Sequence, residues 1–309
     1  MVNHLLIRTC CSIGSAAILV LPLLLAAAAS SATESLKIAA WNIEHLMAEE
    51  GTGCKPREDE DYALVRHYAE QLDADVIALQ EIENAAAAHR VFDPEEYAIE
   101  VSRRNGADRG ECWDHPGQTY GPLHTGFAIR HEVDYERHAD VHNPSIDGRH
   151  GVDVEIRMDG ETLRLLSVHL RSGCLTNEHD ARGEPACDTL HAQMDLVTDW
   201  LDARTREGQP AAALGDFNRR FTLPDDRLWA RLSDGAPAEY TNLTEGHEQI
   251  CRGPNKGMPY IDHIILNPMA VPYVASDLLP IAYDEPFDDA PSDHCPIAVR
   301  LRADSASTW

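Results

Sequence analysis

The chain has few basic side chains for its length. Its 309 residues include 26 Lys and Arg against 52 Asp and Glu, a formal net charge of −26 at pH 7. Because nonspecific affinity for nucleic acids comes mainly from Lys and Arg side chains that neutralise phosphates, this balance argues against a tight DNA-binding module. An acidic surface is instead compatible with a soluble exported enzyme.

Three other features are absent, and each absence excludes a class of protein. No repeat with a period of roughly 20–50 residues occurs, which excludes a solenoid. No Cys-x-x-Cys pair occurs, so the closely spaced ligands of a structural zinc site are missing. No linker after the N-terminal segment is long enough to divide the chain into separate domains.

Long apolar runs are also scarce, and the clearest one lies at the N-terminus. Arg8 precedes the almost wholly apolar stretch 13–29, and small residues continue to Ala32. This order predicts a signal peptide over residues 1–32, a domain over residues 33–309, and a secreted or periplasmic protein without a membrane span after cleavage. An uncleaved anchor is the alternative, but a run of ~17 residues is short for a membrane helix, and Pro22 interrupts it.

The cysteines fit an exported protein. Two of the eight cysteines lie in the predicted signal, and six remain, at positions 54, 112, 174, 187, 251 and 295. An even number of cysteines in an oxidising compartment predicts a disulfide framework. Cys174 and Cys187 enclose a short polar loop and are the favoured pair. Pairing 54 with 112 and 251 with 295 is one of the connectivities that the sequence leaves open for the other four.

Strand and helix patterns alternate through residues 33–309, which predicts an α/β protein. Helical spacing of apolar residues predicts a helix over 62–73 and another from Leu190 to the stop at Gly208. Helix propensity predicts a short helix over 85–88. Apolar segments predict strands over 36–43, 76–79, 97–101, 126–130, 151–157, 162–170, 260–266 and 296–301, and a central strand ending at Gly215. Segments 103–121, 172–188 and 222–259 are predicted to be irregular.

Polar side chains follow several of these strands. After the central strand, Asp216 and Asn218 are two residues apart on an extended chain and therefore lie on the same face. The pattern recurs at other strand ends with the residues Asn42, Glu81, His169, Asp262, Asp293 and His294. Each residue alone also fits a purely structural role, such as capping a turn or lying in the core. Together they predict one site.

The residue types in this set suit phosphoryl chemistry. Carboxylate and amide oxygens bind Mg²⁺, Mn²⁺ or Ca²⁺ better than zinc. Two histidines supply acid–base or electrostatic groups around one reacting centre, and Asp262 is available to orient His294. Phosphoryl transfer needs a cation, a base for water and help for the leaving oxygen.

Six short motifs occur in an order that resembles the endonuclease/exonuclease/phosphatase superfamily. That group includes deoxyribonuclease I, exonuclease III-like repair enzymes, bacterial sphingomyelinases and inositol polyphosphate 5-phosphatases. The resemblance spans residues 36–302 and rests on Ala-Trp-Asn42-Ile, Gln80-Glu81, Ser-Val-His169, Gly-Asp216-Phe-Asn218, Ile-Asp262-His and Ser-Asp293-His294. It implies a four-layered α/β sandwich, in which two mostly antiparallel β-sheets pack face to face and are flanked by helices.

The resemblance also implies roles for single residues in a catalytic domain over 33–309. Asn42, Glu81 and Asp293 match metal ligands, with Mg²⁺ (or Mn²⁺ or Ca²⁺) as the cation. The positions that match catalytic residues are His169, Asp216, Asn218, Asp262 and His294. Arg130 matches a phosphate contact of deoxyribonuclease I. Arg171 is a further phosphate contact if it makes the cleft locally basic with Arg219, Arg220 and Lys256; otherwise these four form a solvated surface.

The same resemblance implies a function. The expected activity is that of a secreted metal-dependent phosphodiesterase, a nuclease with nucleic acid as substrate and no stable protein partner. Glu83 departs from the pattern, because deoxyribonuclease I presents a basic DNA contact there. The alternative substrate is a phospholipid head group or a phosphorylated small molecule, although no long aromatic membrane-binding hairpin is evident. A catalytically silent scaffold is a third hypothesis.

Overall fold

The computed structural model describes Met1 and residues 35–303, except 106–109, 114, 147, 159, 234–236, 238 and 252. The predicted signal peptide, apart from Met1, and most of the tail after residue 303 lie outside this part. The helices and strands of the described residues belong to the unit formed by residues 33–309. Within the described residues, no helix has the length and apolar character needed to cross a membrane.

The first sheet is built around a parallel pair, β1 and β2, and its other neighbours are antiparallel. Residues 38–41 of β1 and 76–79 of β2 are continuous apolar segments, as expected for strands that are covered on both faces. In spatial order the six strands are β13 (Leu279–Pro280), β14 (Ile297–Leu301), β1 (Leu36–Leu46), β2 (Val76–Ile82), β6 (His124–Arg130) and β3 (Tyr97–Val101).

The second sheet repeats this plan around the parallel pair β9 and β10. Its spatial order is β11 (Thr241–Asn242), β12 (Asp262–Leu266), β10 (Ala211–Asp216), β9 (Glu161–His169), β8 (Val152–Met158) and β7 (Tyr135–Arg137). A separate two-stranded ribbon consists of β4 (Gly110–Glu111) and β5 (Thr119–Tyr120).

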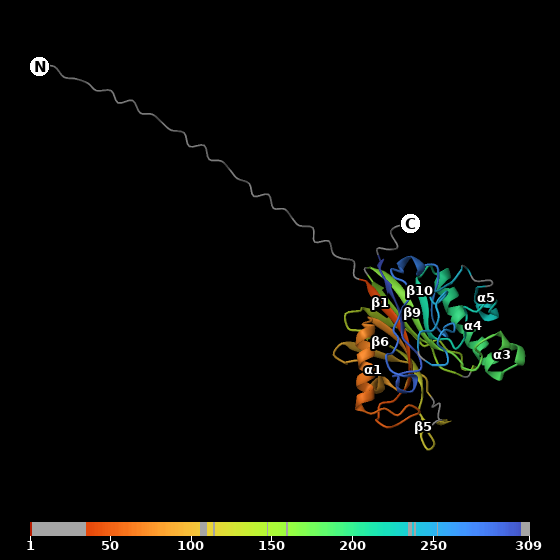
Figure 1. Ribbon diagram of the computed structural model, residues 1–309. Helices are drawn as coiled ribbons and strands as arrows, with labels where there is room; N and C mark the ends of the chain where they lie inside the picture. Colours follow the sequence, from red (N-terminus) through yellow and green to blue (C-terminus); the bar gives the residue numbers. More distant parts are fainter. Residues whose placement is uncertain are drawn as a thin grey trace. The chain divides into compact units, whose positions relative to one another are not determined.

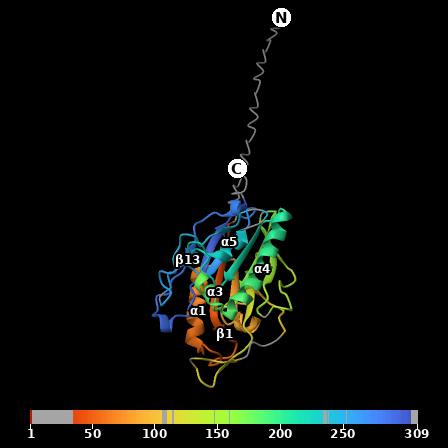
Figure 2. The ribbon, with the colours of Figure 1, turned by 90° about the vertical axis from the view of Figure 1, so that its right-hand side faces the viewer.

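The two sheets pack face to face, with helices on the outer faces (Figure 1). Alternate residues of each strand separate the layers: Ile38 and Ala40 face the second sheet, whereas Ala39 and Trp41 face helix α1 (Asp59–Leu72). On the other side, α4 (Pro185–Arg206) and α5 (Arg227–Ser233) cover the second sheet (Figure 2). The predicted four-layered sandwich is confirmed.

Helix boundaries differ from the predicted ones where capping residues precede the apolar pattern. Helix α1 begins three residues before Tyr62, because Glu58 and Asp61 form a reciprocal capping box. Helix α4 begins at Pro185, inside the segment predicted to be a loop, and proline is favoured in the first turn because it has no N–H to satisfy. Helix α2 (Ala85–Ala88) has its predicted bounds.

Most of the elements that the sequence pattern missed are short. The predicted loops contain α3 (Asn177–Arg182), α5, β4, β5 and β11, and the connector between β6 and β8 contains β7. Strands of two or three residues are too short to show an alternating pattern. The 3₁₀ helices Val271–Tyr273 and Phe287–Asp289 are single turns, which are too short to show the spacing of apolar residues that marks a helix.

Three disulfides link the loops to the sandwich. They join Cys54 to Cys112, Cys174 to Cys187, and Cys251 to Cys295. The favoured Cys174–Cys187 pair is therefore formed, and the other four cysteines adopt the connectivity that was considered for them. The first bond attaches the β4–β5 ribbon to the loop after β1, and the third ends one residue after His294.

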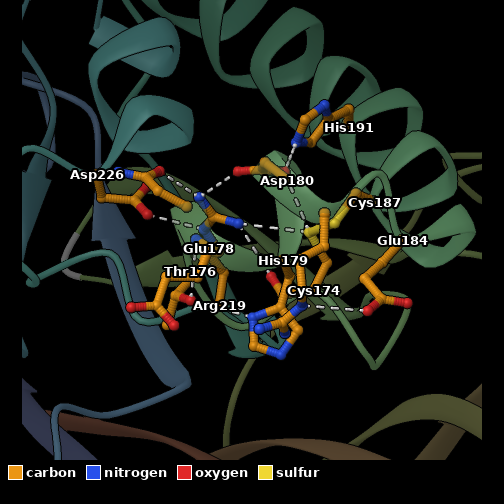
Figure 3. The surroundings of a disulfide bond; sticks show 12 residues. Cys174, Thr176, Glu178, His179, Asp180, Glu184, Cys187, His191, Arg219 and Asp226 are labelled. Carbon is orange, nitrogen blue, oxygen red and sulfur yellow. Dashed lines mark hydrogen bonds and ion pairs between the residues drawn. A yellow bond between two sulfur atoms is a disulfide. The ribbon is translucent and has the colours of Figure 1, made fainter.

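Arg219 is fully buried beside the Cys174–Cys187 disulfide (Figure 3). Its Nε donates to Asp226, and its Nη2 donates to Asp180, each at 2.8 Å. Its Nη1 donates to the Cys174 carbonyl at 3.1 Å. Asp180 also lies close to both sulfur atoms, but the disulfide leaves no thiolate to bind a metal ion there. This network joins α3, α5 and the chain that follows β10.

His263 continues the network into the second sheet. It is fully buried in β12, its Nε2 donates to the Arg219 carbonyl at 2.8 Å, and its Nδ1 accepts from Thr244 and Asn242. Burial lowers the pKa of His263 from 6.5 to about 4. The imidazole is therefore neutral in the folded protein and holds the chain after β10 through hydrogen bonds.

Gly215 lies where strand β10 is closely approached by the backbone of β9 and by a side chain of the first sheet. Its φ is +137°, a backbone conformation that residues other than glycine rarely adopt. A Cβ atom there would lie 2.2 Å from the Val168 carbonyl oxygen and 2.8 Å from Gln80 Nε2. The glycine lets the chain turn directly before Asp216.

We expect Gly215→Ala to destabilise the protein by about 3 kcal/mol, since the new Cβ atom adds a backbone clash to an unfavourable φ. Urea unfolding followed by circular dichroism measures the effect. Gly160→Ala is the matched control, because Gly160 also has a positive φ but a Cβ atom there would have nothing within 4 Å. The control should cost about 1 kcal/mol. Equal losses for both variants would contradict the clash.

The stability of the fold should also depend on the titration of His263. Because the pKa of His263 is lower in the folded than in the unfolded state, the unfolded state binds the proton first as pH falls below 6.5, and stability is lost until the pH reaches about 4. Between pH 7.5 and 4.5 this amounts to ~2.5 kcal/mol. His263→Gln should remove that share of the pH dependence of unfolding. Parallel pH profiles for both proteins would show that His263 does not titrate as expected.

Candidate active site

The strand directions bring the predicted polar residues to one edge of the sandwich. In the first sheet, Asn42 and Glu81 lie near the ends of the parallel strands β1 and β2. In the second sheet, Asp216 at the end of β10 pairs with His169 at the end of β9. Strands β12 and β14 run in the opposite direction, so their first residues, and those just before them, reach the same edge.

Asn42 links the carboxylates of the two sheets. Its Nδ2 lies 3.4 Å from Glu81 Oε1 and 3.2 Å from Asp216 Oδ2, and its Oδ1 accepts from the Glu44 amide. Asn42 and Asp216 are almost fully buried, whereas Glu81 is half-buried. The two sheets therefore contribute acidic groups to the same small volume.

Asp216 and Asn218 are held as a unit. Asp216 Oδ1 accepts from the Asn218 amide at 2.8 Å, and its Oδ2 accepts from Asn218 Nδ2 at 3.1 Å. Asn218 Nδ2 also lies 3.1 Å from the Leu170 carbonyl. Burial raises the pKa of the Asp216 carboxyl, and the neighbouring Asp262 adds to the rise while His294 opposes it.

His294 is oriented by Asp262, as the sequence predicted. His294 Nδ1 donates to Asp262 Oδ2 at 2.8 Å, which leaves Nε2 directed toward Asp216 Oδ2 and Asp293 Oδ1, each 3.9 Å away. Although burial lowers the pKa of His294, the carboxylates of Asp262, Asp293 and Asp216 raise it well above its usual value. The site therefore favours the imidazolium form of this residue.

His169 has the opposite electrostatic setting. It is 3% exposed, its Nε2 lies 3.4 Å from Asp216 Oδ2 and 3.8 Å from Glu81 Oε1, and its Nδ1 has no hydrogen-bond partner in the described part of the chain. Burial, then the charges of Arg149, His294 and His45, lower the pKa of His169 well below its usual value. A neutral ring with its proton on Nε2 fits this arrangement.

The backbone is strained where it delivers these groups. Glu81 (φ +62°) and Asn218 (φ +53°) adopt the left-handed conformation, as do Glu44 and His45 after Asn42. Such conformations cost about 1–3 kcal/mol each for residues other than glycine and persist only where the surroundings hold them. Arg57 does so for the second pair, because its buried guanidinium donates to the carbonyls of residues 43, 44, 45 and 291.

The acidic groups have few cations to balance them. Lys55 pairs with Glu44, whereas Glu81, Asp216 and Asp262 form ion pairs with histidines within the described residues. Asp262 Oδ1 is buried without a hydrogen-bond partner there, and ligand atoms of Asp216, Asp262 and His294 lie within 4.8 Å of one another. Burial also raises the pKa of Asp293. An excess of carboxylates of this kind suits a divalent cation, whereas His294, whose pKa is raised by the same carboxylates, is not one of its ligands.

A cleft of about 520 Å³ opens beside Glu81. Glu81 and His45 line it, together with Arg149 and Arg171. The Arg171 amide donates to Gln193 at 2.7 Å, and its side chain is exposed. The structure therefore places Arg171 in the same cleft as Glu81.

Arg130 is not part of the site, which corrects its predicted role as a phosphate contact. Strand β6 is antiparallel to β2, so its last residue lies beside the start of β2 rather than beside Glu81. There Arg130 donates to Asp73 at 2.7 Å and to the Tyr97 hydroxyl at 3.0 Å. The sequence predicted the end of the strand correctly but not the edge of the sheet to which it points.

The predicted basic group around Arg171 is also corrected in part. Arg219 is fully buried in the network beside the disulfide, so it does not face a substrate. Arg220 is buried as well and donates to the Pro259 carbonyl and to Asn255. Lys256 is exposed but is not among the residues that line the cleft. Of the four, only Arg171 lines it.

Two cleft residues received no role from the sequence. His45 lies close to Glu81, with its amide donating to Oε2 at 3.1 Å and its Nε2 at 3.6 Å from the same oxygen. Its position three residues after Asn42 was a usable signal. Arg149 lies in a connector without periodicity, and no local pattern marks it.

Solved structures with the same fold support this architecture. A humanised form of D. rerio TDP2 carrying 14 mutations aligns with a TM-score of 0.61 and 19% identity, over 87% of this chain and 99% of that one. The AP endonuclease LMAP from Leishmania major aligns with a TM-score of 0.58 and 13% identity, over 87% and 88%. The human nocturnin catalytic domain aligns with a TM-score of 0.54 and 13% identity, over 86% and 92%.

No curated protein sequence matches the chain. A family model does match, over residues 39–294, and this range includes every residue predicted for the site. The chain therefore belongs to the Endonuclease/Exonuclease/phosphatase family, whose members are metal-dependent hydrolases of phosphodiesters.

Proposed function

We propose that this protein is an exported nuclease that hydrolyses nucleic-acid phosphodiester bonds by in-line attack of water. The observation that carries the proposal is the meeting of the His294–Asp262 pair with the Asp216–Asn218 unit across 3.9 Å, beside Glu81. An imidazolium and a carboxylate that face each other across a short gap can act on one phosphate and one water.

Asp216 is the group that orients the attacking water and accepts its proton. Its Oδ2 faces the site, and its Oδ1 is held by the Asn218 amide, so the carboxylate cannot rotate freely. A buried carboxyl whose pKa is raised is a stronger base than one in water. Asn218 fixes this orientation through its second hydrogen bond to Asp216.

His294 stabilises the charge that develops on phosphorus-bound oxygen. Its Nδ1 is committed to Asp262, so its Nε2 proton is the one directed into the site. Asp262 keeps the ring in this orientation and favours its charged form. His169, which is buried and neutral, donates a hydrogen bond through Nε2 that stabilises the leaving oxygen, and that oxygen takes its proton from solvent water.

Glu81, Asn42 and Asp293 are the residues that would hold the cation. Glu81 presents its carboxylate at the cleft, and Asp293 lies near His294 in the segment before β14. A bound Mg²⁺, Mn²⁺ or Ca²⁺ would supply charge stabilisation for the phosphate oxygens. The excess of carboxylates over cations at this edge supports the assignment.

Two observations support export, and a third supports a nucleic-acid substrate. The N-terminal sequence has the order of a signal peptide, and the three disulfides suit an oxidising compartment. Among the structures with this fold, one is described as D. rerio TDP2 complexed with a single-strand DNA product, with 20% identity. The acidic balance of the chain keeps a phospholipid head group or a small phosphate ester as the alternative substrate.

Replacing His294 or Asp216 with Ala should lower the turnover of the true substrate by roughly 10³-fold, because each change removes a group that acts on the reacting atoms. The assay offers plasmid DNA, RNA, sphingomyelin and bis(4-nitrophenyl) phosphate with Mg²⁺, Mn²⁺ or Ca²⁺, and circular dichroism confirms folding. Arg300→Ala, an exposed change at the far end of β14, is the control. Near-normal turnover in the two site variants would refute the proposed roles.

Removing the cation should also lower stability. A ligand that binds only the folded state stabilises it by ~2.7 kcal/mol at 100 times its Kd, so Mg²⁺ or Mn²⁺ should raise the Tm of chelator-treated protein. Glu81→Gln should reduce this rise strongly, whereas Glu95→Gln, an exposed change before β3, should not. If both variants gain as much as the wild type, Glu81 does not hold the cation.

A further inference from the structure

The rim of the active-site cleft presents an exposed indole. Trp113 is 96% exposed, far more than the other large apolar side chains of the described residues except Met1. It lines the same cleft as Glu81, with Tyr120 from strand β5. Trp side chains offer a large flat surface that is well suited to contact with a ligand.

The indole is carried by an anchored ribbon. Trp113 follows Cys112, which is bonded to Cys54 in the loop after β1. Gln118 in the same ribbon donates to the Gly51 carbonyl at 3.0 Å, and the ring of Tyr120 meets His45 edge to face at 5.9 Å. The ribbon that includes β5 is visible in Figure 1. These contacts fix the base of Trp113 relative to the residues beside Glu81.

Two arginines, Arg149 and Arg171, also line the cleft. The side chains of Arg149 and Arg171 make no ion pair or hydrogen bond with any residue that the structure describes, although acidic residues outnumber basic ones two to one. Arg149 Nε is even buried without a partner among those residues. Glu44, Glu81 and Glu111 line the same cleft, so the positive charge is confined to the two guanidinium groups.

We propose that the cleft selects single-stranded nucleic acid: Trp113, supported by Tyr120, stacks on an unpaired base, while Arg149 and Arg171 contact phosphates on either side of the cleaved bond. The inference rests on the proposed nuclease function and assigns its substrate class. Every base has a face that can stack on an aromatic ring, but the bases of a duplex are already stacked on one another. Stacking also needs no positive surface.

Selection of a single strand resolves the conflict between an acidic chain and a polyanionic substrate. A duplex would bring the phosphates of two strands against a surface with a net charge of −26. A single strand that is held by one or two stacked bases and two arginines makes few phosphate contacts. Binding should therefore depend weakly on salt, with a log–log slope of about −1.4 for two phosphates.

The first experiment measures binding to the inactive His294→Ala protein, purified with its disulfides formed. The probes are a single-stranded oligonucleotide, its duplex, and the same strand with abasic residues. We expect the single strand to quench tryptophan emission and to bind at least tenfold more tightly than the other two probes. Adding Trp113→Ala should weaken binding of the single strand about tenfold, whereas the exposed control Val271→Ala should not.

The phosphate contact of Arg171 is tested in the same His294→Ala protein. Arg171→Ala should flatten the salt slope by about 0.7, the share of one phosphate in a single strand. Arg300→Ala, which removes an exposed arginine remote from the cleft, should leave the slope unchanged. Equal affinity for single strand and duplex, or no effect of Trp113→Ala, would overturn the inference. So would a blue shift of Trp113 emission on sphingomyelin vesicles without any response to oligonucleotides, which indicates a membrane contact instead.

A hydrolysis arm separates this inference from the proposed function. With the catalytically intact protein, Trp113→Ala should raise the KM for the single strand about tenfold and leave kcat nearly unchanged, because the stacked base lies outside the reacting atoms. If nucleic acid is cleaved with an unchanged KM, the stacking role fails and the nuclease function stands. If no nucleic acid is cleaved under any cation, both fail.

Discussion

The site depends on the parallel pairing of two strands at the centre of each sheet. Because β1 and β2 run in the same direction, Asn42 and Glu81 reach the same edge, and β9 and β10 do the same for His169 and Asp216. Face-to-face packing then brings both edges together. The carboxylates that meet there repel one another, and placing them in a partly buried volume costs free energy that the apolar layers offset.

That electrostatic cost gives the two histidines different states. His294 contacts three carboxylates and is held as a cation, whereas His169 is more deeply buried and lies near the positive charges of Arg149, His294 and His45. Identical side chains therefore differ because of their surroundings, as expected when burial and neighbouring charge compete. The strained backbone at Glu81 and Asn218 shows a similar balance, since local cost is accepted where it delivers a functional group.

Much of this arrangement could be predicted from the sequence. Asp216 is marked by an apolar strand that ends in a polar residue, Asp262 and His294 are marked by apolar strands that begin with or just after a polar residue, and a resemblance across six motifs implied the sandwich. What local patterns lack is direction: Arg130 does end a strand, but an antiparallel partner turns that end away from the site. Arg219 directly follows Asn218, yet its side chain points into the protein, because Asp180 and Asp226 are there to receive it. Neither acid is marked as its partner by any local pattern.

The hydrogen bond from Asn42 to Asp216 crosses from one sheet to the other, at 3.2 Å. Adjacent residues along a strand are separated by about 3.3 Å, so a slip of one sheet past the other by a single residue would separate these two groups completely. The apolar layer between the sheets therefore sets the distance between the reacting groups. A cavity in that layer, for example beside Ala40 or Leu214, would therefore displace the reacting groups and alter the reaction, although no residue that carries out the reaction is itself changed.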